Sequence, residues 1–530
     1  MGADTAGGAD AAGETEGAAP AASLELRLRP GAVAWAGVGA TAGLAAYLTA
    51  GSLRWPLVHD APLMHYVAGR ILDGAVPYRD LFDMNFPGVY VVHLLGLVLL
   101  GRGDAGFRAL DLAVLAGTVA GLAVALRSFG YRACIAAGAL FWLYHLAGGA
   151  WRAGQRDLLL CLPLAWMSAA ALADVLRPRA LALGLAAAAL GIAVWIKPYA
   201  VLWLPVVVAL AWRRPPAARA AAGAAALLGF ALPGAFVLGW LAAAGGLAAF
   251  VDIVLGYLPL YARVGRESLL AAVRGHDQGP LTLAALGVWA AGGAVALWRA
   301  GRPDARLVVL VTGVVYGGLH FAVQGKGWEY HLYPLALFAI ALGAAGLPAA
   351  LDTGRRGLAT VLVVALGVAA GALAVKGVRN LDAAWIAEKH ARARAVAAAV
   401  APVVAAGGTV QVLDTTDGGL HALYWLGARQ PTRFLYDFHF YHHVEQPFIR
   451  RLRAELLAGL RARPPGAVVL FERGWPAGGY GRLREFPELA QWLEAGYQVV
   501  LEGDRFRVYA PRRDRAPRPP SQASGRAAHG

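Results

Sequence analysis

Charged residues are scarce in this chain of 530 residues, and their scarcity argues against a soluble protein. Only 15% of the residues are charged, whereas 58% are hydrophobic and the mean hydropathy is +0.52. A soluble protein of this length needs far more polar surface. The uncharged runs repeat at close to the ~20 residues with which a helix crosses a bilayer. The composition therefore predicts a polytopic α-helical membrane protein.

Cysteine is almost absent, which excludes a disulfide framework or a cysteine-based zinc site. The two cysteines, Cys134 and Cys161, both lie inside apolar runs and are expected to be small core residues. P-loop and H-E-x-x-H motifs are lacking as well. The sequence GRGDAG at 101–106 has glycine spacing like that of a dinucleotide-binding loop, but no strand precedes it. The motifs therefore indicate neither a nucleotide site nor a zinc-protease site.

The net charge of +15 is carried by arginines in the short loops between apolar runs, a pattern that sets membrane topology and argues against a nucleic-acid partner. One run, 86–101, is short and contains His93. If run 86–101 does not cross the membrane, the basic loops all fall on the same side as Arg27 and Arg29, which the positive-inside rule makes the cytoplasmic side. We therefore expect 86–101 to be an interfacial helix and the N-terminus to be cytoplasmic. The predicted spans are 31–51, 105–126, 133–150, 158–176, 180–196, 199–212, 217–244, 280–298, 307–323, 331–350 and 358–375.

The order of these segments predicts four regions of a multi-pass cell-membrane protein. An acidic tail precedes the first apolar run, so that run is expected to be an uncleaved span and not a signal peptide. After the last span, the strand-like segments TVQVLD, AVVLFER, YQVVLEG and RFRVYA alternate with two amphipathic segments, which predicts a small extracytoplasmic α/β domain. The predicted regions are a disordered cytoplasmic tail (1–30), a transmembrane domain (31–378) with an outer loop (52–104), the α/β domain (379–512) and a disordered tail (513–530).

Ionisable residues gather at the outer ends of the predicted spans, while the span centres are nearly free of charge. An ion-coupled transporter usually keeps an ionisable group near the middle of the membrane. An enzyme that works at the outer interface instead gathers its acids and bases there. The residues concerned are Asp60, Asp80, Asp83, Asp157, Lys197, Lys326, Glu329 and His331.

Two further patterns have simple interpretations. The segment HFYHHVE at 439–445 has the residue types of a metal site, although a polar loop explains it as well. The segment GATAG at 39–43 has the G-x-x-x-G spacing that is typical of close helix packing.

The loop after the first span resembles a known family. Asp60 is followed by AGRILDGAVPYRDLFDMNFPGVY and then LLGLVLLGRGDAGFRALDL, and later outer segments read GQRDLLLCLPLAW, GIAVWIKPYAVLWLP and GKGWEYHLYPL. Over roughly residues 31–350 the chain is similar to the GT-C membrane glycosyltransferases that use polyprenyl-phosphate sugars, especially bacterial relatives of protein O-mannosyltransferases and lipid A aminoarabinose transferases. The resemblance implies a GT-C fold of about eleven transmembrane helices.

The resemblance also implies inverting sugar transfer on the outer face, from a polyprenyl-phosphate-linked donor to a glycan, lipid or protein acceptor. Asp60 matches the first-loop acid that acts as general base or orients the acceptor, and Asp157 matches the acid of the second outer loop, so the resemblance implies that both are catalytic residues. Where aminoarabinose transferases have Lys-Pro, this chain has Asn85 before Phe-Pro. No cofactor is expected, and a divalent metal is not indicated. The candidate substrate-binding residues are His59, Tyr78, Arg156, Lys197, Lys326 and His331.

The chemistry of such a reaction fits the pattern independently of the family. An acceptor hydroxyl needs a carboxylate to take its proton, and the leaving phosphate needs fixed basic groups. Two alternatives remain at this stage: a transporter or flippase of lipid-linked glycans, and a non-catalytic scaffold of the cell envelope.

Overall fold

The computed structural model describes residues 30–274, 279–301, 304–353, 356–475 and 479–512. The two predicted disordered tails lie outside the described residues apart from Pro30, as do Arg27 and Arg29, whose charges supported the topology.

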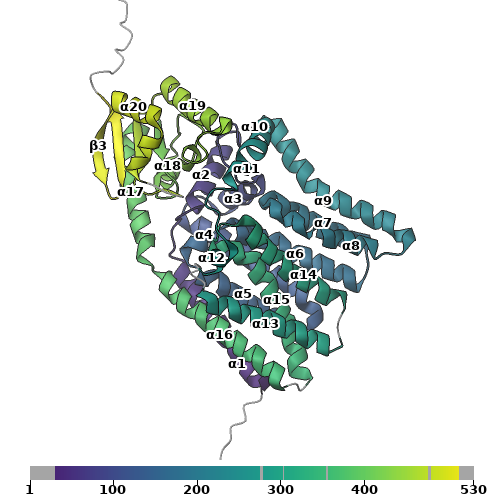
Figure 1. Cartoon of the computed structure of the whole chain (residues 1–530). Coiled ribbons are helices and arrows are strands. Elements are labelled where there is room, and N and C mark those ends of the chain that lie inside the picture. Colours follow the sequence, from purple (N-terminus) through teal and green to yellow (C-terminus); the bar gives the residue numbers. More distant parts are fainter. Residues whose placement is uncertain (1–29, 275–278, 302–303, 354–355, 476–478, 513–530) are drawn as a thin grey trace, which may run out of the picture.

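A helix forms over each of the eleven predicted spans (Figure 1). Within the described part of the chain, eight of these helices are long and apolar enough to cross a membrane, and α5, α7 and α8 are shorter. The fold is thus mostly helical and membrane-embedded, as predicted. The bounds are α1 Pro30–Ser52, α4 Asp104–Leu126, α5 Tyr131–Ala147, α6 Arg156–Leu176, α7 Ala180–Ile196, η3 Pro198–Trp203 continuing as α8 Leu204–Trp212, α9 Pro216–Ala244, α13 Gly279–Arg299, α14 Ala305–Gln324, α15 Tyr333–Asp352 and α16 Arg356–Leu381.

Helix α15 lies at the centre of the bundle. It packs against α5, α6, α13, α14 and α16, and its side chains are buried on nearly every face. Gly343 and Gly346 meet Gly293 of α13 so closely that a Cβ on any of them would clash with the facing helix, as is typical of close transmembrane packing. The prediction that GATAG serves such packing is wrong, because Gly39 and Gly43 face open space within the described chain.

The connections at one end of the bundle carry most of the remaining short helices. The predicted interfacial segment forms α3, whose 14 residues span about 21 Å. This is short of the ~30 Å hydrocarbon core, and Val98 and Leu99 on one face of α3 are exposed. The short elements are α2 Ala61–Leu72, α3 Pro87–Leu100, η1 Arg127–Phe129, η2 Ala150–Arg152, α10 Leu247–Asp252, η4 Ile253–Tyr257, α11 Leu258–Tyr261, α12 Leu269–Arg274 and η5 Glu329–Leu332.

The region after α16 contains the small α/β unit that the sequence predicts. All four strand-like segments form strands of one sheet in the order β1-β2-β4-β3, in which β1 and β2 are parallel and the other pairs are antiparallel. Both amphipathic segments are helical. The bounds are α17 Ala384–Ala405, β1 Val410–Leu413, α18 Gly419–Leu426, η6 Phe438–Phe440, α19 Pro447–Ala462, β2 Ala467–Phe471, η7 Tyr480–Glu485, α20 Pro487–Gly496, β3 Tyr497–Gly503 and β4 Phe506–Pro511.

The α/β unit docks on the loop between α1 and α4. Figure 1 shows α17 rising from the bundle to the sheet, with α18 and α19 beside α2 and α10. Phe82 N donates to the Arg433 carbonyl at 2.7 Å, and the Tyr66 hydroxyl donates to the Ala428 carbonyl at 3.1 Å. Only two residues separate α16 from α17, so the domain boundary at 378/379 stays a prediction.

The sidedness of this arrangement is tested by cysteine labelling. In a background without Cys134 and Cys161, a cysteine replacing exposed Arg177 between α6 and α7 is expected to react only from the cytoplasm. A cysteine replacing exposed Glu502 on β3 is expected to react from the opposite side. Equal accessibility of the two positions to an impermeant maleimide in intact cells would contradict the predicted topology.

Candidate active site

Asp60 stands at the start of α2 without performing the usual task of a helix-capping aspartate. An aspartate at this position normally accepts backbone N–H groups of the first turn, but its side chain makes no such bond here. Instead, Oδ2 accepts from Gln155 Nε2 at 3.0 Å. Oδ1 lies 3.8 Å from His59 Nε2, which is beyond hydrogen-bond distance. One carboxylate oxygen thus remains available.

Asp60 faces a cavity of ≈ 160 Å³ whose walls come from five distant parts of the chain. We name it the Asp60 cavity. The first loop, the start of α6 with the turn before it, α11, the segment around η5 and the α/β unit each contribute, so the cavity exists only where the bundle and the unit meet. Its lining residues are His59, Asp60, Met84, Trp151, Arg156, Tyr261, Trp328, Tyr330, Thr415, Thr416, Tyr436, Phe438 and Trp475.

The electrostatic surroundings keep the Asp60 carboxylate ionised. Burial by itself would raise its pKa, but the charge of His59 in its protonated form, the charges of Arg156 and Lys389 and the hydrogen bond from Gln155 outweigh burial and lower the pKa below its usual value. His59 is held neutral at pH 7, because burial lowers its pKa to about 4. At neutral pH the cavity therefore presents an ionised carboxylate beside an uncharged imidazole.

Arg156 connects the Asp60 cavity to a second cavity. It is the first residue of α6, contacts the amide oxygen of Asn85 and donates from Nη2 to the Tyr330 hydroxyl at 3.3 Å. Its buried Nε has no partner among the described residues. A buried N–H without a partner is costly, so this group is suited to an anionic ligand. Arg156 also supplies the positive charge that Asn85 itself lacks.

The second cavity, of ≈ 80 Å³, contains two of the four lysines of the chain, Lys197 and Lys326. We name it the lysine cavity. It runs beside η3 and α11 and shares Met84, Arg156, Tyr261 and Trp328 with the Asp60 cavity. Its lining residues are Met84, Asn85, Phe86, Arg156, Ile196, Lys197, Pro198, Tyr199, Leu258, Tyr261, Ala262, Gln324, Lys326, Trp328 and His331.

Each lysine of this cavity is held by its own neighbours. Lys197 Nζ donates to Asp157 Oδ2 at 2.5 Å. Lys326 Nζ donates to the Tyr261 and Val264 carbonyls at 3.1 and 2.6 Å and lies 4.2 Å from the centre of the Tyr261 ring. Burial, with smaller contributions from nearby arginines, lowers the pKa of Lys326 to about 8. An ammonium has three donors, so Lys197 retains two that Asp157 does not use.

Asp157 and Tyr78 line neither cavity. Asp157 is completely buried, and its oxygens accept from Lys197 and from His320, the latter at 2.7 Å. Tyr78 is 1% exposed, and its hydroxyl donates to the Asn85 carbonyl at 2.7 Å. Both residues instead contact residues that line the lysine cavity, Asp157 through Lys197 and Tyr78 through Asn85. The other predicted residues do meet: Asp60 and His59 in the first cavity, Lys197, Lys326 and His331 in the second, and Arg156 in both.

The histidine-rich segment at 439–445 does not form a metal site. His439 Nδ1 and His442 Nε2 lie 2.5 and 3.0 Å from the Tyr257 hydroxyl, while His443 is exposed and Glu445 pairs with Arg450. Among the described residues, no group of three metal-ligating side chains converges. The segment ties the α/β unit to η4.

The α/β unit contributes cavity walls that the sequence analysis missed. Thr415 and Thr416 come from the segment DTTDGG, which follows β1 at the carboxyl end of a parallel strand pair. Loops at that edge of a sheet commonly carry binding residues, and this signal could have singled out the segment. The buried carboxylate of Asp414 shapes it by accepting the backbone N–H groups of Asp417 and Gly419 at 2.8 and 2.7 Å.

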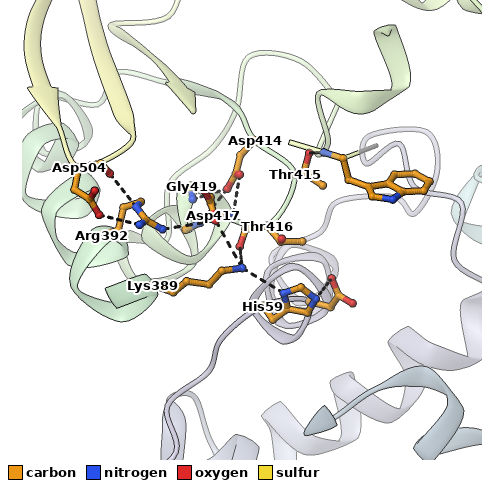
Figure 2. Close-up of polar contacts among 12 residues, drawn as sticks. His59, Lys389, Arg392, Asp414, Thr415, Thr416, Asp417, Gly419 and Asp504 are labelled. Atoms are coloured by element: carbon orange, nitrogen blue, oxygen red, sulfur yellow. Dashed lines mark hydrogen bonds and ion pairs between the residues drawn. The ribbon is translucent and has the colours of Figure 1, made fainter. Parts of the chain in front are cut away.

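Lys389 of α17 joins this segment to the Asp60 cavity. Figure 2 shows its ammonium between the DTTDGG segment and His59. Nζ donates to the Thr416 carbonyl at 3.1 Å, lies 3.7 Å from Asp417 Oδ1 and lies 3.3 Å from His59 Nδ1. Asp417 also faces Arg392, which is anchored on Asp504 at 2.8 Å. A chain of charged groups therefore runs from the α/β unit to the residue beside Asp60.

No protein-family model and no curated protein matches the chain, but its fold is shared with solved membrane proteins. ArnT from Cupriavidus metallidurans bound to undecaprenyl phosphate aligns with TM-score 0.55 and 15% identity, over 90% of this chain and 98% of that one. The apo form aligns with the same score and identity, over 91% and 98%. The archaeal oligosaccharyltransferase AglB from Archaeoglobus fulgidus, in complex with an inhibitory peptide and a dolichol-phosphate, aligns at TM-score 0.48 and 11% identity, over 91% and 75%. The predicted GT-C fold is confirmed.

Proposed function

We propose that this chain is an inverting glycosyltransferase that moves a sugar from a polyprenyl-phosphate donor to a hydroxyl of a cell-envelope acceptor. The observation that carries the proposal is the joining of two cavities at Arg156. One presents an ionised carboxylate with an available oxygen, and the other presents two lysines. A base in one cavity and a set of cations in the adjoining cavity are what transfer from a phosphate donor requires.

In the proposed reaction the acceptor hydroxyl lies against Asp60. Oδ1 takes its proton while the oxygen forms a bond to the anomeric carbon. The bond between that carbon and the phosphate oxygen breaks on the opposite side, and the phosphate keeps the electron pair. Arg156, Lys197 and Lys326 stabilise the growing negative charge in a site with little water. Attack opposite to the leaving group inverts the anomeric centre.

The donor is placed in the lysine cavity. The fold is shared with ArnT in a structure bound to undecaprenyl phosphate, which supports a polyprenyl phosphate as the lipid ligand. Arg156 Nε is a buried donor without a partner in the described structure, and so is His331 Nδ1 when that nitrogen carries the ring proton. A phosphate would satisfy both.

Asp157 acts in this scheme as a positioning residue. Its carboxylate is paired with Lys197 and His320 and is sealed from both cavities. It holds the Lys197 ammonium at the wall of the lysine cavity and takes no proton from the acceptor. This differs from the catalytic role that the family resemblance implies for it.

The function is tested by following label in membranes of a strain that produces the protein. Radiolabelled nucleotide sugars fill the pool of polyprenyl-phosphate sugars. Label is expected to leave one of these pools when the wild-type chain is present and to accumulate in it when the chain is absent. A flippase would leave the total label of the pool unchanged and alter only its sidedness, which would contradict the proposal. If the label in these pools and its sidedness were the same with and without the chain, the result would favour the non-catalytic scaffold.

Removing the charge of Lys389 is expected to change the pH dependence of transfer. The ammonium is one of the groups that lower the pKa of Asp60, so Lys389→Met raises that pKa. Asp60 must be deprotonated to act as a base, and activity is lost as pH falls through its pKa. The acidic limb of the kcat–pH profile should therefore move to higher pH in Lys389→Met and stay in place in Lys389→Arg. A lower Tm with an unmoved limb would mean that Lys389 is only structural.

A further inference from the structure

A third cavity, of ≈ 890 Å³, is lined largely by residues of α13, α16 and α17. We name it the lateral cavity. It lies between the beginning of α13 and the last turns of α16, below the first turns of α17. Its walls include Trp151, Leu281, Ala372, Val375, Lys376 and Arg379. Figure 1 shows α13 and α16 side by side, with α17 leading from α16 to the sheet.

The lateral cavity is divided into an apolar part and a cationic part. Leu281 and Val375 are 60% and 54% exposed, so its apolar rim faces outward between two helices that are long and apolar enough to cross a membrane. Lys376 and Arg379 follow Ala372 by one and two turns of α16 toward α17, and Lys389 lines the same end. An apolar entrance with cations at its headgroup end is complementary to an anionic amphipath.

The cations differ in how far they are neutralised. Lys376 Nζ lies 2.5 Å from Glu329 Oε1, which also pairs with Arg152 at 3.1 Å. The exposed Arg379 has no hydrogen bond or ion pair to any residue that the structure describes. Lys389 has its nearest carboxylate, that of Asp417, at 3.7 Å. The wall therefore carries an excess of positive charge.

The lateral cavity adjoins the Asp60 cavity. His59 and Trp151 line both, and their rings are 5.5 Å apart. The lateral cavity shares no lining residue with the lysine cavity. Two further cavities therefore adjoin the Asp60 cavity, the lysine cavity at Arg156 and the lateral cavity at His59 and Trp151.

We propose that the lateral cavity is the acceptor site and that the acceptor is an anionic lipid whose headgroup also carries a hydroxyl. This proposal rests on the proposed glycosyltransferase function. Arg379 and Lys389 hold the anionic group, the acyl chains leave between α13 and α16, and the headgroup hydroxyl extends past His59 to Asp60. In the transfer, that hydroxyl gives its proton to Asp60 and its oxygen forms the glycosidic bond, while the anomeric carbon–phosphate bond breaks.

A protein acceptor fits this entrance poorly. A polypeptide brings backbone N–H and C=O groups that need partners when they leave water. The rim at Leu281, Ala372 and Val375 offers hydrocarbon only. Acyl chains need no such partners, and their burial against apolar side chains is favourable.

Gly371 provides a way to block the cavity without disturbing the fold. It lines the lateral cavity, and a Cβ added there meets no atom within 4 Å, so Gly371→Phe should fill the entrance. Gly367, one turn earlier on the same helix, is equally open but does not line the cavity, so Gly367→Phe is the matched control. For charge, Arg379→Gln is compared with Arg54→Gln, since Arg54 pairs with Asp382 outside the cavity.

The experiment measures binding of two probes to the purified full chain in neutral detergent by native mass spectrometry. Dioctanoyl phosphatidylglycerol, which is anionic and carries hydroxyls, is expected to bind at least about fivefold more weakly to Gly371→Phe and to Arg379→Gln than to the controls. Dioctanoyl phosphatidylcholine should bind weakly to all of them. Undecaprenyl phosphate should bind the wild type and Gly371→Phe alike and should lose affinity in Lys197→Met.

The outcomes separate the two proposals. Equal phosphatidylglycerol binding by Gly371→Phe and Gly367→Phe, or no preference for the anionic lipid over the zwitterionic one, would overturn the acceptor site. Failure of the wild type to bind undecaprenyl phosphate would instead count against the donor site and the proposed function, whatever the lateral cavity binds.

Discussion

Asp60→Asn is expected to lower sugar transfer by about 10²–10⁴-fold, the usual contribution of a general base. The amide keeps the size of the carboxylate and can still accept from Gln155 through its oxygen, but it cannot take the acceptor proton. Binding of undecaprenyl phosphate should hardly change, because the donor contacts lie beyond Arg156. The measurement is kcat in the transfer assay together with the affinity for undecaprenyl phosphate.

The matched control for this variant is Asp73→Asn. Asp73 lies in the same loop, at the other end of α2, and pairs with Arg70 at 2.9 Å outside the Asp60 cavity. Transfer by Asp73→Asn should stay near wild type. A folded Asp60→Asn protein with near-normal turnover would remove Asp60 from the mechanism.

The second large effect is expected at the buried pair of Asp157 and Lys197. Leaving one charge of a buried pair without its partner typically costs about 3–5 kcal/mol, whereas replacing both by neutral residues is often close to neutral. Asp157→Asn and Lys197→Met should each lower the Tm in detergent. The double variant should recover most of that stability.

The affinity for undecaprenyl phosphate should depend on whether Lys197 is present and not on the Tm of the variant. A hydrogen bond to a charged group contributes enough that its loss weakens binding about tenfold to a hundredfold. Undecaprenyl phosphate should therefore bind poorly to Lys197→Met and to the stable double variant. If Asp157 were the base, Asp157→Asn would lose turnover while keeping both its Tm and its affinity for undecaprenyl phosphate.

The glycine patterns illustrate how little spacing alone decides. GATAG has the spacing of a packing motif, yet Gly39 and Gly43 face outward, while Gly293 of α13 and Gly343 of α15 meet across the bundle without being part of any such motif. Spacing determines which residues share a helix face. Which face another helix covers depends on the arrangement of the whole bundle.

The roles of individual acids were likewise beyond the sequence. Asp60 and Asp157 each follow a basic residue, His59 and Arg156, in the predicted outer part of the chain and looked equivalent there. The structure leaves Asp60 Oδ1 facing a cavity and surrounds Asp157 with Lys197 and His320. This difference arises from contacts over 40 and 163 residues of separation, which no local pattern encodes.

The sequence by itself determined the helices and the strands of this protein, because hydrophobic length and alternation are local properties. An uncharged run of about twenty residues such as 31–51 can satisfy its backbone in a bilayer only as a helix, and alternating residues such as RFRVYA at 505–510 favour a strand. The cavities were decided by the tertiary structure alone. Asp60, Trp328 and Thr415 line one cavity although more than 350 residues separate the first from the last, and only the docking of the α/β unit on the helix bundle brings them together.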